Sequence, residues 1–221
     1  MDQHLVRKLT PDQYRTTAWS CGTTTQLWIE PYEADYADRD FLWRISSAAV
    51  EDEISTFTPL PDYDRFIAAI QGDIVLRHEG GEPLSLHPYD VHAFDGGAST
   101  LCTGRCRDFN LLLRKGRAEG TLEAVKLPSL PAFNGLAPLP APPVLTLRPQ
   151  AACEELLLFC AEGSASVTVV PPRSAGPFPA SDVIISLSEN EAMILQGKAS
   201  SILVIGGGVL MLAQMWRTPG A

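Results

Sequence analysis

One segment of the chain places an arginine beside a hydroxyl side chain. In Leu42 to Val50, the alternation of a β-strand puts Arg44 and Ser46 on the same face. Arg65 opens a second apolar strand, Arg65 to Ile70. The planar guanidinium group of arginine suits a carboxylate, because the two can form a pair of parallel hydrogen bonds. If both arginines point into a small β-barrel, they form a polar pocket for an anion.

Asp108 and Asn110 share a face by the same alternation, in the strand expected from Asp108 to Arg114. An inward Asn110 would add an amide group to the pocket. The pattern also fits a structural role, in which Arg44 pairs with Asp108 or faces solvent. Periodicity does not tell which face of a strand is inside, so both interpretations stay open.

A third segment, Trp19 to Pro31, combines an aromatic ring with hydroxyl groups. After Trp19, a glycine turn leads to three successive threonines, among them Thr24 and Thr25, at the start of an expected strand. These hydroxyls could bind a ligand or could satisfy the backbone at the edge of a sheet.

The cysteines give no sign of disulfide or nucleophile chemistry. The chain has five, and only Cys102 and Cys106 lie close together, around a three-residue loop that suggests a hairpin. We expect two reduced thiols, because a two-thiolate zinc site would need two further ligands. No Ser-His-Asp or Cys-His arrangement has supporting context, so no catalytic residue is assigned.

The polar segments belong to a run of short strands between Phe41 and Asn110, whose order matches that of a cupin-type jelly roll. Metal-using cupins place two histidines two residues apart, and this chain has no such pair. His87 and His92 are five residues apart and would point to opposite faces of an extended chain. We expect each histidine on the surface or in a loop, and neither a metal nor another cofactor.

The expected fold class is all-β, with two cupin-like jelly-roll barrels, a bicupin. Residues 127–149 hold seven of the 18 prolines and are predicted to be an extended connector between barrels at 1–126 and 150–221. In the second half, Glu162-Gly163 suggests a turn between two strands, and Gly206 to Gly208 a turn or bulge. The one helix candidate is Pro11 to Ala18.

The composition of the chain limits the classes of binding partner that we expect. The formal net charge of −9 argues against a nucleic-acid surface, because phosphate binding needs clustered Lys and Arg. The N-terminal segment lacks the apolar core of a signal peptide, and no apolar segment reaches the ~18 residues of a membrane span. We expect a cytoplasmic protein without a membrane partner.

Six motifs in order make the chain resemble the HutD/Ves family between about Leu5 and Lys115. They are W-S-C-G-T-T-T-Q-L, F-L-W-R-I-S-S-A, S-T-F-T-P-L-P-D-Y-D-R, G-D-I-V-L-R-H-E-G, F-D-G-G and D-F-N-L-L-L-R. The resemblance implies a bicupin, dimeric in many members, that binds a small carboxylate of histidine degradation, such as urocanate or a formylated glutamate. It implies a regulator or governor of histidine utilisation without established catalysis.

The family's pocket motif falls on a set of residues in this chain. These are Trp19, Thr24, Thr25, Arg44, Ser46, Ser55, Phe57, Arg65, Asp108, Phe109 and Asn110. In the roles expected from the resemblance, Arg44 and Arg65 clamp the anion, hydroxyl and amide groups orient it, and Trp19 and Phe57 form an apolar wall. Asp62 stands where the family usually has glycine, which adds a carboxylate near Arg65. Two other classes remain open: a cupin isomerase or dioxygenase with an unconventional site, and a structural dimer module.

Overall fold

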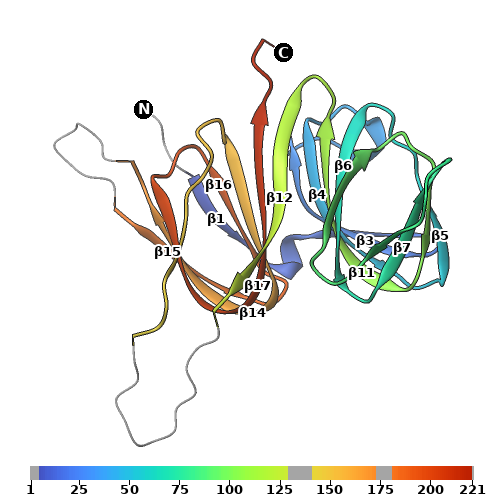
Figure 1. Cartoon of the computed structure of the whole chain (residues 1–221). Helices are drawn as coiled ribbons and strands as arrows, with labels where there is room; N and C mark the ends of the chain where they lie inside the picture. The colour runs from blue at the N-terminus through green and yellow to red at the C-terminus, as the bar shows by residue number, and fades with distance from the viewer. Residues whose placement is uncertain (1–4, 129–140, 173–180, 221) are drawn as a thin grey trace, which may run out of the picture. The chain divides into compact units, whose positions relative to one another are not determined.

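The computed structural model describes residues 5–128, 141–172 and 181–220 (Figure 1). Among these residues there are strands and two short 3-10 turns, η1 (Pro11–Gln13) and η2 (Tyr36–Asp38), but no α-helix. The all-β expectation is therefore confirmed. The helix candidate Pro11 to Ala18 is wrong, because only Pro11–Gln13 forms a 3-10 turn and the second half belongs to strand β2 (Arg15–Trp19), which pairs with β3 (Gly22–Glu30). No described helix is long and apolar enough to cross a bilayer.

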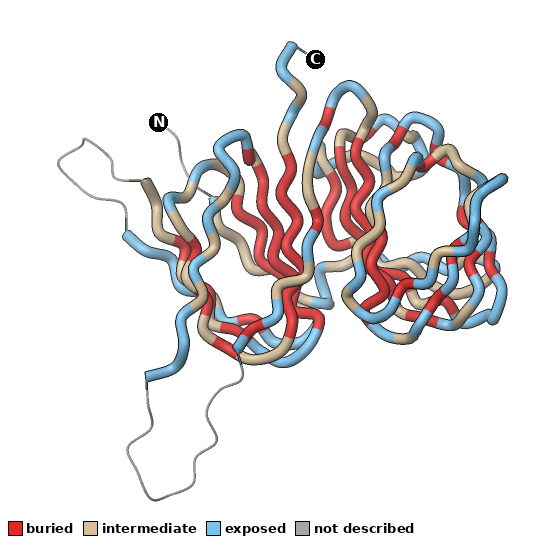
Figure 2. Tube along the Cα trace, viewed as in Figure 1, coloured by how far each residue is buried: buried red, intermediate tan, exposed pale blue. Residues whose placement is uncertain are grey.

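The strands belong to two compact units, each of which has its own core. The first unit comprises Gln13–Leu122 and Arg217–Ala221, and the second comprises Met1–Asp12 and Glu123–Trp216. In both units the red, buried segments lie along the strands, and the connecting loops are mostly exposed (Figure 2).

The first unit contains two antiparallel sheets. The six-stranded sheet has the order β2-β3-β4-β11-β6-β9, and the four-stranded sheet has the order β5-β10-β7-β8. The remaining bounds of the larger sheet are β4 (Trp43–Val50), β11 (Cys106–Arg114), β6 (Tyr63–Gln71) and β9 (Val91–Asp95). Those of the smaller sheet are β5 (Ile54–Phe57), β10 (Thr100–Thr103), β7 (Ile74–His78) and β8 (Leu84–Leu86).

An apolar core fills one part of the space between these two sheets. It combines side chains of the larger sheet, such as Val50 and Ile67, with side chains of the smaller one, such as Phe57 and Leu76. Along β4, the inward side chains change from Val50 and Ala48 to the polar Ser46 and Arg44. The inward face is therefore apolar at one end of the strand and polar at the other.

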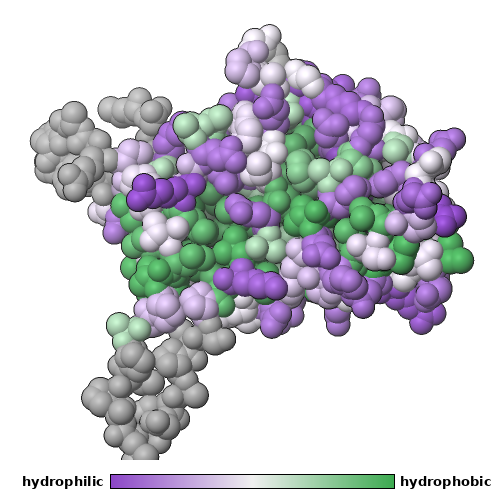
Figure 3. All heavy atoms as spheres, in the orientation of Figure 1, coloured by the Kyte–Doolittle hydropathy of each residue, from purple (hydrophilic) through white to green (hydrophobic). Residues whose placement is uncertain are grey.

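The second unit is built on one seven-stranded sheet. Its main order is β1-β16-β14-β17-β12, with β13 on β17 and β15 on β14. The bounds are β1 (Leu5–Leu9), β12 (Ala118–Leu127), β13 (Leu145–Leu147), β14 (Glu155–Val170), β15 (Val183–Ser188), β16 (Ala192–Gln196) and β17 (Ser201–Arg217). Hydrophobic residues gather over the strands of this unit on the face seen in Figure 3.

The observed division of the chain differs from the expected barrels at 1–126 and 150–221. Strand β1 pairs with β16 through Leu5↔Gln196 and Leu9↔Ala192, so the first strand completes the second unit. Strand β12 begins in the first unit and ends in the second. In the predicted connector, residues 129–140 lie outside the described residues, and β13 pairs with β17.

Two turns expected in the second half are absent from the described residues, where β14 and β17 each continue without interruption. Glu162-Gly163 lies inside β14, with a register shift between Cys160 and Glu162, and Gly206 to Gly208 lie inside β17. Gly163 and Gly208 face each other with positive φ, 79° and 108°. Glycine bends the paired strands together here because a Cβ on Gly163 would collide with the carbonyl oxygen of Gly207.

The expected hairpin between Cys102 and Cys106 is also wrong. Cys102 lies on β10 in the smaller sheet and Cys106 on β11 in the larger sheet, so the loop between them crosses from one sheet to the other. Both thiols are buried in the core of the first unit and are reduced. Burial raises the pKa of Cys102 to about 11, although the positive charge of Arg65 opposes the shift.

Candidate functional site: a pocket lined by three arginines

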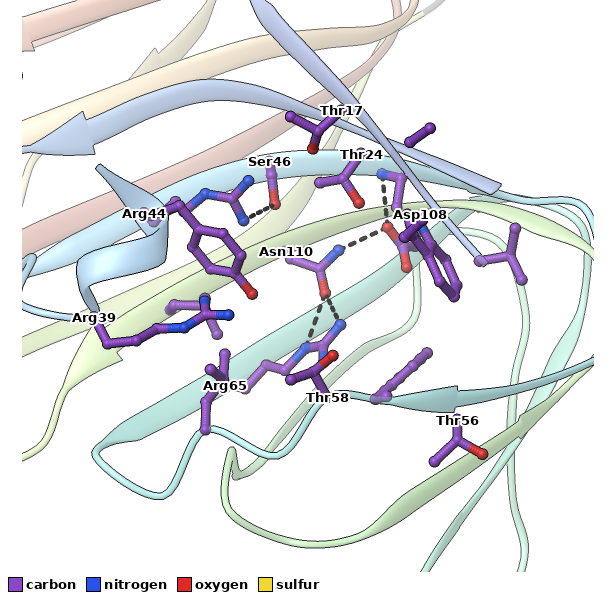
Figure 4. A pocket seen from close by; sticks show the side chains of 18 residues that line it. Thr17, Thr24, Arg39, Arg44, Ser46, Thr56, Thr58, Arg65, Asp108 and Asn110 are labelled. Carbon is purple, nitrogen blue, oxygen red and sulfur yellow. Dashed lines mark hydrogen bonds between the residues drawn. The ribbon is translucent and has the colours of Figure 1, made fainter. Parts of the chain in front are cut away.

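A pocket of about 270 Å³ opens in the first unit, at the polar end of the inward face. Strands β4, β6 and β11 supply five of its polar side chains, which are Arg44, Ser46, Arg65, Asp108 and Asn110. Since β4 and β11 pair directly, Ser46 lies opposite Asn110 and Ala48 opposite Asp108. The alternation predicted for both strands is what turns these side chains to the same side (Figure 4).

Eight of the ten residues predicted as ligand-binding line this pocket. They are Trp19, Thr24, Arg44, Ser46, Phe57, Arg65, Asp108 and Asn110. Thr25 does not, because it alternates with Thr24 and its hydroxyl contacts that of Thr16 at 2.9 Å. Ser55 does not either, since it is buried opposite Cys102 on the paired strand β10.

Arg44 is almost fully buried, with 6% of its surface exposed, yet its hydrogen-bond partners are neutral. Its Nε donates to Gln26 Oε1 at 2.8 Å and its Nη1 to Ser46 Oγ at 3.3 Å, and its guanidinium lies 4.0 Å from the ring centre of Tyr36. Burial lowers the pKa of Arg44 to about 10, and the charges of Arg39 and Arg65 add to this.

Arg65 is held in a similar way. Its Nε and Nη2 both donate to Asn110 Oδ1, at 3.0 and 2.6 Å, and its guanidinium lies 4.3 Å from the ring centre of Phe57. Burial lowers the pKa of Arg65, while the nearby Asp108 opposes that shift. The ring of Phe57 and the side-chain amide of Asn110 together hold the guanidinium group of Arg65 in place.

Arg39 is a third arginine of the pocket, which the sequence did not indicate. It follows η2 with a left-handed φ of 56°, and its guanidinium lies 3.6 Å from the ring centre of Tyr36. Its Nη1 is buried and has no hydrogen-bond partner among the described residues. Because Arg39 and Tyr36 come from a loop, no strand alternation marks them as pocket residues.

None of these three arginines forms an ion pair with a carboxylate of the described residues. The described ion pairs are Lys8–Glu191, Arg15–Asp35, His87–Asp73, Lys115–Asp95 and Arg217–Glu30. Buried charge without a counter-ion is unfavourable, because the low-dielectric interior replaces water around it. A negatively charged ligand would remove this penalty, so the charge of the arginines is complementary to an anion.

Asp108 is the one carboxyl group that lines the described pocket. It is 1% exposed, and its Oδ1 accepts hydrogen bonds from the backbone N of Ala48 at 2.9 Å and from Asn110 Nδ2 at 2.6 Å. Burial raises the pKa of Asp108 to about 6, although the charge of Arg65 and the two hydrogen bonds oppose the shift. Asn110 thus connects Arg65 to Asp108, as its oxygen faces the arginine and its nitrogen the carboxylate.

A pair of histidines lies outside this pocket, and the sequence gave no sign of it. His78 Nε2 and His92 Nε2 are 2.9 Å apart, and His78 Nδ1 lies 2.9 Å from Thr100 Oγ1. Both rings pack beside Phe94, and burial lowers the pKa of each imidazole. The sequence led us to expect each histidine on the surface or in a loop, whereas the structure places His78 in β7 and His92 in β9, both half-buried. Among the described residues, no three His, Cys, Asp or Glu side chains are grouped for a metal ion.

Comparison with known proteins identifies the fold and a family. A model of the HutD family matches residues 11–137. The structure of HutD from Pseudomonas fluorescens SBW25, in a formate condition, is 22% identical with a TM-score of 0.71, covering 97% of this chain and 100% of that chain. A conserved protein of unknown function from Pseudomonas aeruginosa PAO1 is 21% identical with a TM-score of 0.73, covering 96% and 98%. No curated protein sequence matches the chain.

More distant structures share the same fold. The bacterial pirin YhhW from Escherichia coli, in complex with nickel(II), is 7% identical with a TM-score of 0.63, covering 95% of this chain and 98% of that chain. At these identities the likeness concerns the fold alone. The expected fold class, all-β with cupin-like barrels, is confirmed.

Proposed function

Because the chain belongs to the HutD family, we propose that it binds a small carboxylate in the pocket of the first unit and regulates histidine utilisation. The observation that carries the binding proposal is the convergence of Arg39, Arg44 and Arg65 without a carboxylate partner among the described residues. The regulatory role and the choice among acids of histidine degradation rest on the family resemblance, and the cytoplasmic location stays a prediction from the sequence.

The proposed roles follow the contacts of each side chain. Arg44 and Arg65 clamp the carboxylate, and each is held by a neutral hydrogen-bond partner instead of a direct ion pair. Ser46 and Asn110 orient the ligand beside them, and Trp19 and Phe57 form the apolar wall. Arg39 joins the clamp from its loop, whereas Thr25, first expected to orient the ligand, does not line the pocket.

The size of the pocket favours a metabolite over a larger ligand. Its volume of about 270 Å³ lies just below the roughly 300–1,000 Å³ of pockets that take drug-sized ligands. An acid of about ten heavy atoms, such as urocanate or formylglutamate, is in the range that this space suits.

A thermal-shift screen of small carboxylates tests the proposal. A ligand at 100 times its dissociation constant stabilises the folded state by roughly 2.7 kcal/mol, which is about 5–11 °C for a chain of this length. We expect a shift for wild type and its loss in Arg65→Gln. Arg77→Gln is the matched control. Arg77 is exposed on β7, in the smaller sheet of the first unit, so its substitution should leave the ligand-induced shift unchanged.

The alternatives give different results in the same preparation. If no acid shifts the wild-type melting temperature, the binding proposal fails and the structural dimer module takes its place. If Arg65→Gln responds like wild type, the arginine clamp is wrong. Elemental analysis that finds close to one transition metal per chain would instead favour a cupin enzyme.

A further inference from the structure

Asp108 has one carboxylate oxygen that no described residue satisfies. Its Oδ1 accepts from Ala48 and Asn110, whereas its Oδ2 receives no hydrogen bond from the described residues. Asp108 nevertheless lines the pocket, and in Figure 4 this second oxygen carries no dashed line. Unlike Arg39 Nη1, this oxygen is not fully buried but keeps contact with the open space of the pocket, so a molecule bound there can donate a hydrogen bond to it.

Several polar donors of the pocket have partners other than Asp108 Oδ2. The Nε and Nη2 of Arg65 point to Asn110 Oδ1, and the amide nitrogen of Asn110 points to the other oxygen of Asp108. Arg44 donates to Gln26 and Ser46. The described residues therefore supply no donor to Asp108 Oδ2, which leaves this oxygen free to accept a hydrogen bond from a molecule bound in the pocket.

The charged groups of the pocket are unevenly distributed around it. In Figure 4, Arg39 and Arg44 lie on one side of Asn110, and Asp108 lies on the other. A carboxylate placed against Asp108 would meet a like charge, whereas against Arg39 and Arg44 it meets the uncompensated positive charge. A bound acid is thereby oriented, with its carboxylate at the arginine side and its other end at Asp108.

We propose that Asp108 Oδ2 accepts a hydrogen bond from the bound acid, so that the ligand class is a carboxylic acid with a hydrogen-bond donor at its far end. This inference rests on the proposed carboxylate site and narrows its ligand. An imidazole N–H or an amide N–H fulfils the requirement, and a simple alkyl or aryl carboxylate does not. Asp108 thus selects among acids that the arginines alone would accept equally.

Matched pairs of acids test the inference on the full chain by calorimetric titration. Urocanate is compared with 3-(oxazol-4-yl)acrylate, in which an oxygen replaces the ring N–H and the other ring nitrogen is kept, and N-formylglutamate with its N-methyl derivative. A hydrogen bond to a charged group contributes about 1.5–3 kcal/mol, so we expect the donor-bearing acid of the pair that binds to do so roughly 10- to 150-fold more tightly. In Asp108→Asn the side-chain nitrogen replaces Oδ2 as a donor, and the preference should fall to about one.

The outcomes separate this inference from the proposed function. If none of the four acids binds the wild-type protein, the carboxylate site itself is wrong. If both members of a pair bind with equal affinity, the site stands and the role of Asp108 is wrong. Retention of the full preference by Asp108→Asn would also overturn it. The wild-type comparison needs no variant, so the test does not depend on how Asp108→Asn folds.

Discussion

Asp108→Asn should make the ligand-free protein more stable at neutral and alkaline pH. The pKa of Asp108 is about 6 against an ordinary value of 3.8, because the side chain is buried. The difference, 6 minus 3.8, corresponds to about 3 kcal/mol at roughly 1.36 kcal/mol for each pKa unit. Above pH 6 the folded state carries this unfavourable ionised carboxylate, and an asparagine of the same shape does not.

The sign of the pH dependence follows from the raised pKa. Between pH 3.8 and about 6, the folded protein holds a proton on Asp108 that the unfolded chain has released, so the free energy of unfolding of wild type falls as pH rises through this window. The difference between Asp108→Asn and wild type should therefore be close to zero at pH 4 and reach its full size above pH 7. With about 2–4 °C per kcal/mol for a chain of this length, the largest expected gain in melting temperature is about 6–12 °C.

Urea unfolding or thermal melts of wild type and Asp108→Asn, at pH 4 and pH 8, measure this difference. Asp64→Asn is the matched control, because Asp64 is exposed on β6 and the same change there should have little effect at either pH. The reasoning is refuted if Asp108→Asn is no more stable than wild type at pH 8, or if its gain is the same at pH 4. In either case, Arg65 and the hydrogen bonds to Oδ1 would already compensate the buried charge.

Three further predictions concern regions outside the pocket. Burial lowers the pKa of both members of the histidine pair, so the free energy of unfolding should fall as pH drops below about 6.5. Urea unfolding at pH 5 and pH 7.5 should show a smaller fall in His92→Gln than in wild type. An equal fall in the two proteins would contradict the argument. Gly163→Ala should lower the free energy of unfolding by more than about 2 kcal/mol in urea unfolding, because the added Cβ would collide with the backbone of Gly207. Gly116 has a similar φ but open space around it, so Gly116→Ala should lower the free energy of unfolding by only about 1 kcal/mol. A thiol reagent should modify only Cys21 in the folded protein, since the other four cysteines are buried, and should modify all five after unfolding. Rapid modification of a second cysteine in the folded protein would show that a buried cysteine is accessible.

Strand alternation was enough to predict most of the pocket. It placed Arg44 with Ser46 and Asp108 with Asn110, and the structure places all four in one cavity. It did not tell which face was inside, because almost every residue of β4 is buried on both faces of the sheet. Thr24 and Thr25 were both predicted in the site, but they point to opposite faces of β3 and only Thr24 lines the pocket.

Features that depend on contacts between sheets or on loops were not predictable from the sequence. The histidine pair joins β7 to β9, and no period in the chain relates His78 to His92. Arg39 reaches the pocket from a loop with a left-handed backbone. The turn predicted at Glu162-Gly163 failed for a different reason: glycine ends many strands, but here it allows two long paired strands to bend together.

The pairing of β1 with β16 has a consequence for the order in which the chain can fold during synthesis. The strands of the first unit lie between Arg15 and Arg114 and can pair early, whereas β1 must wait for Ala192, about 180 residues after Leu9. At ~5–20 residues per second, that is roughly 10–40 s on the ribosome. An unpaired apolar strand is open to wrong partners, and Arg7 and Lys8 inside Leu5–Leu9 are the kind of charge that discourages them. Lys8 later forms an ion pair with Glu191 at 2.7 Å, so a charge that protects the nascent chain is reused in the finished sheet.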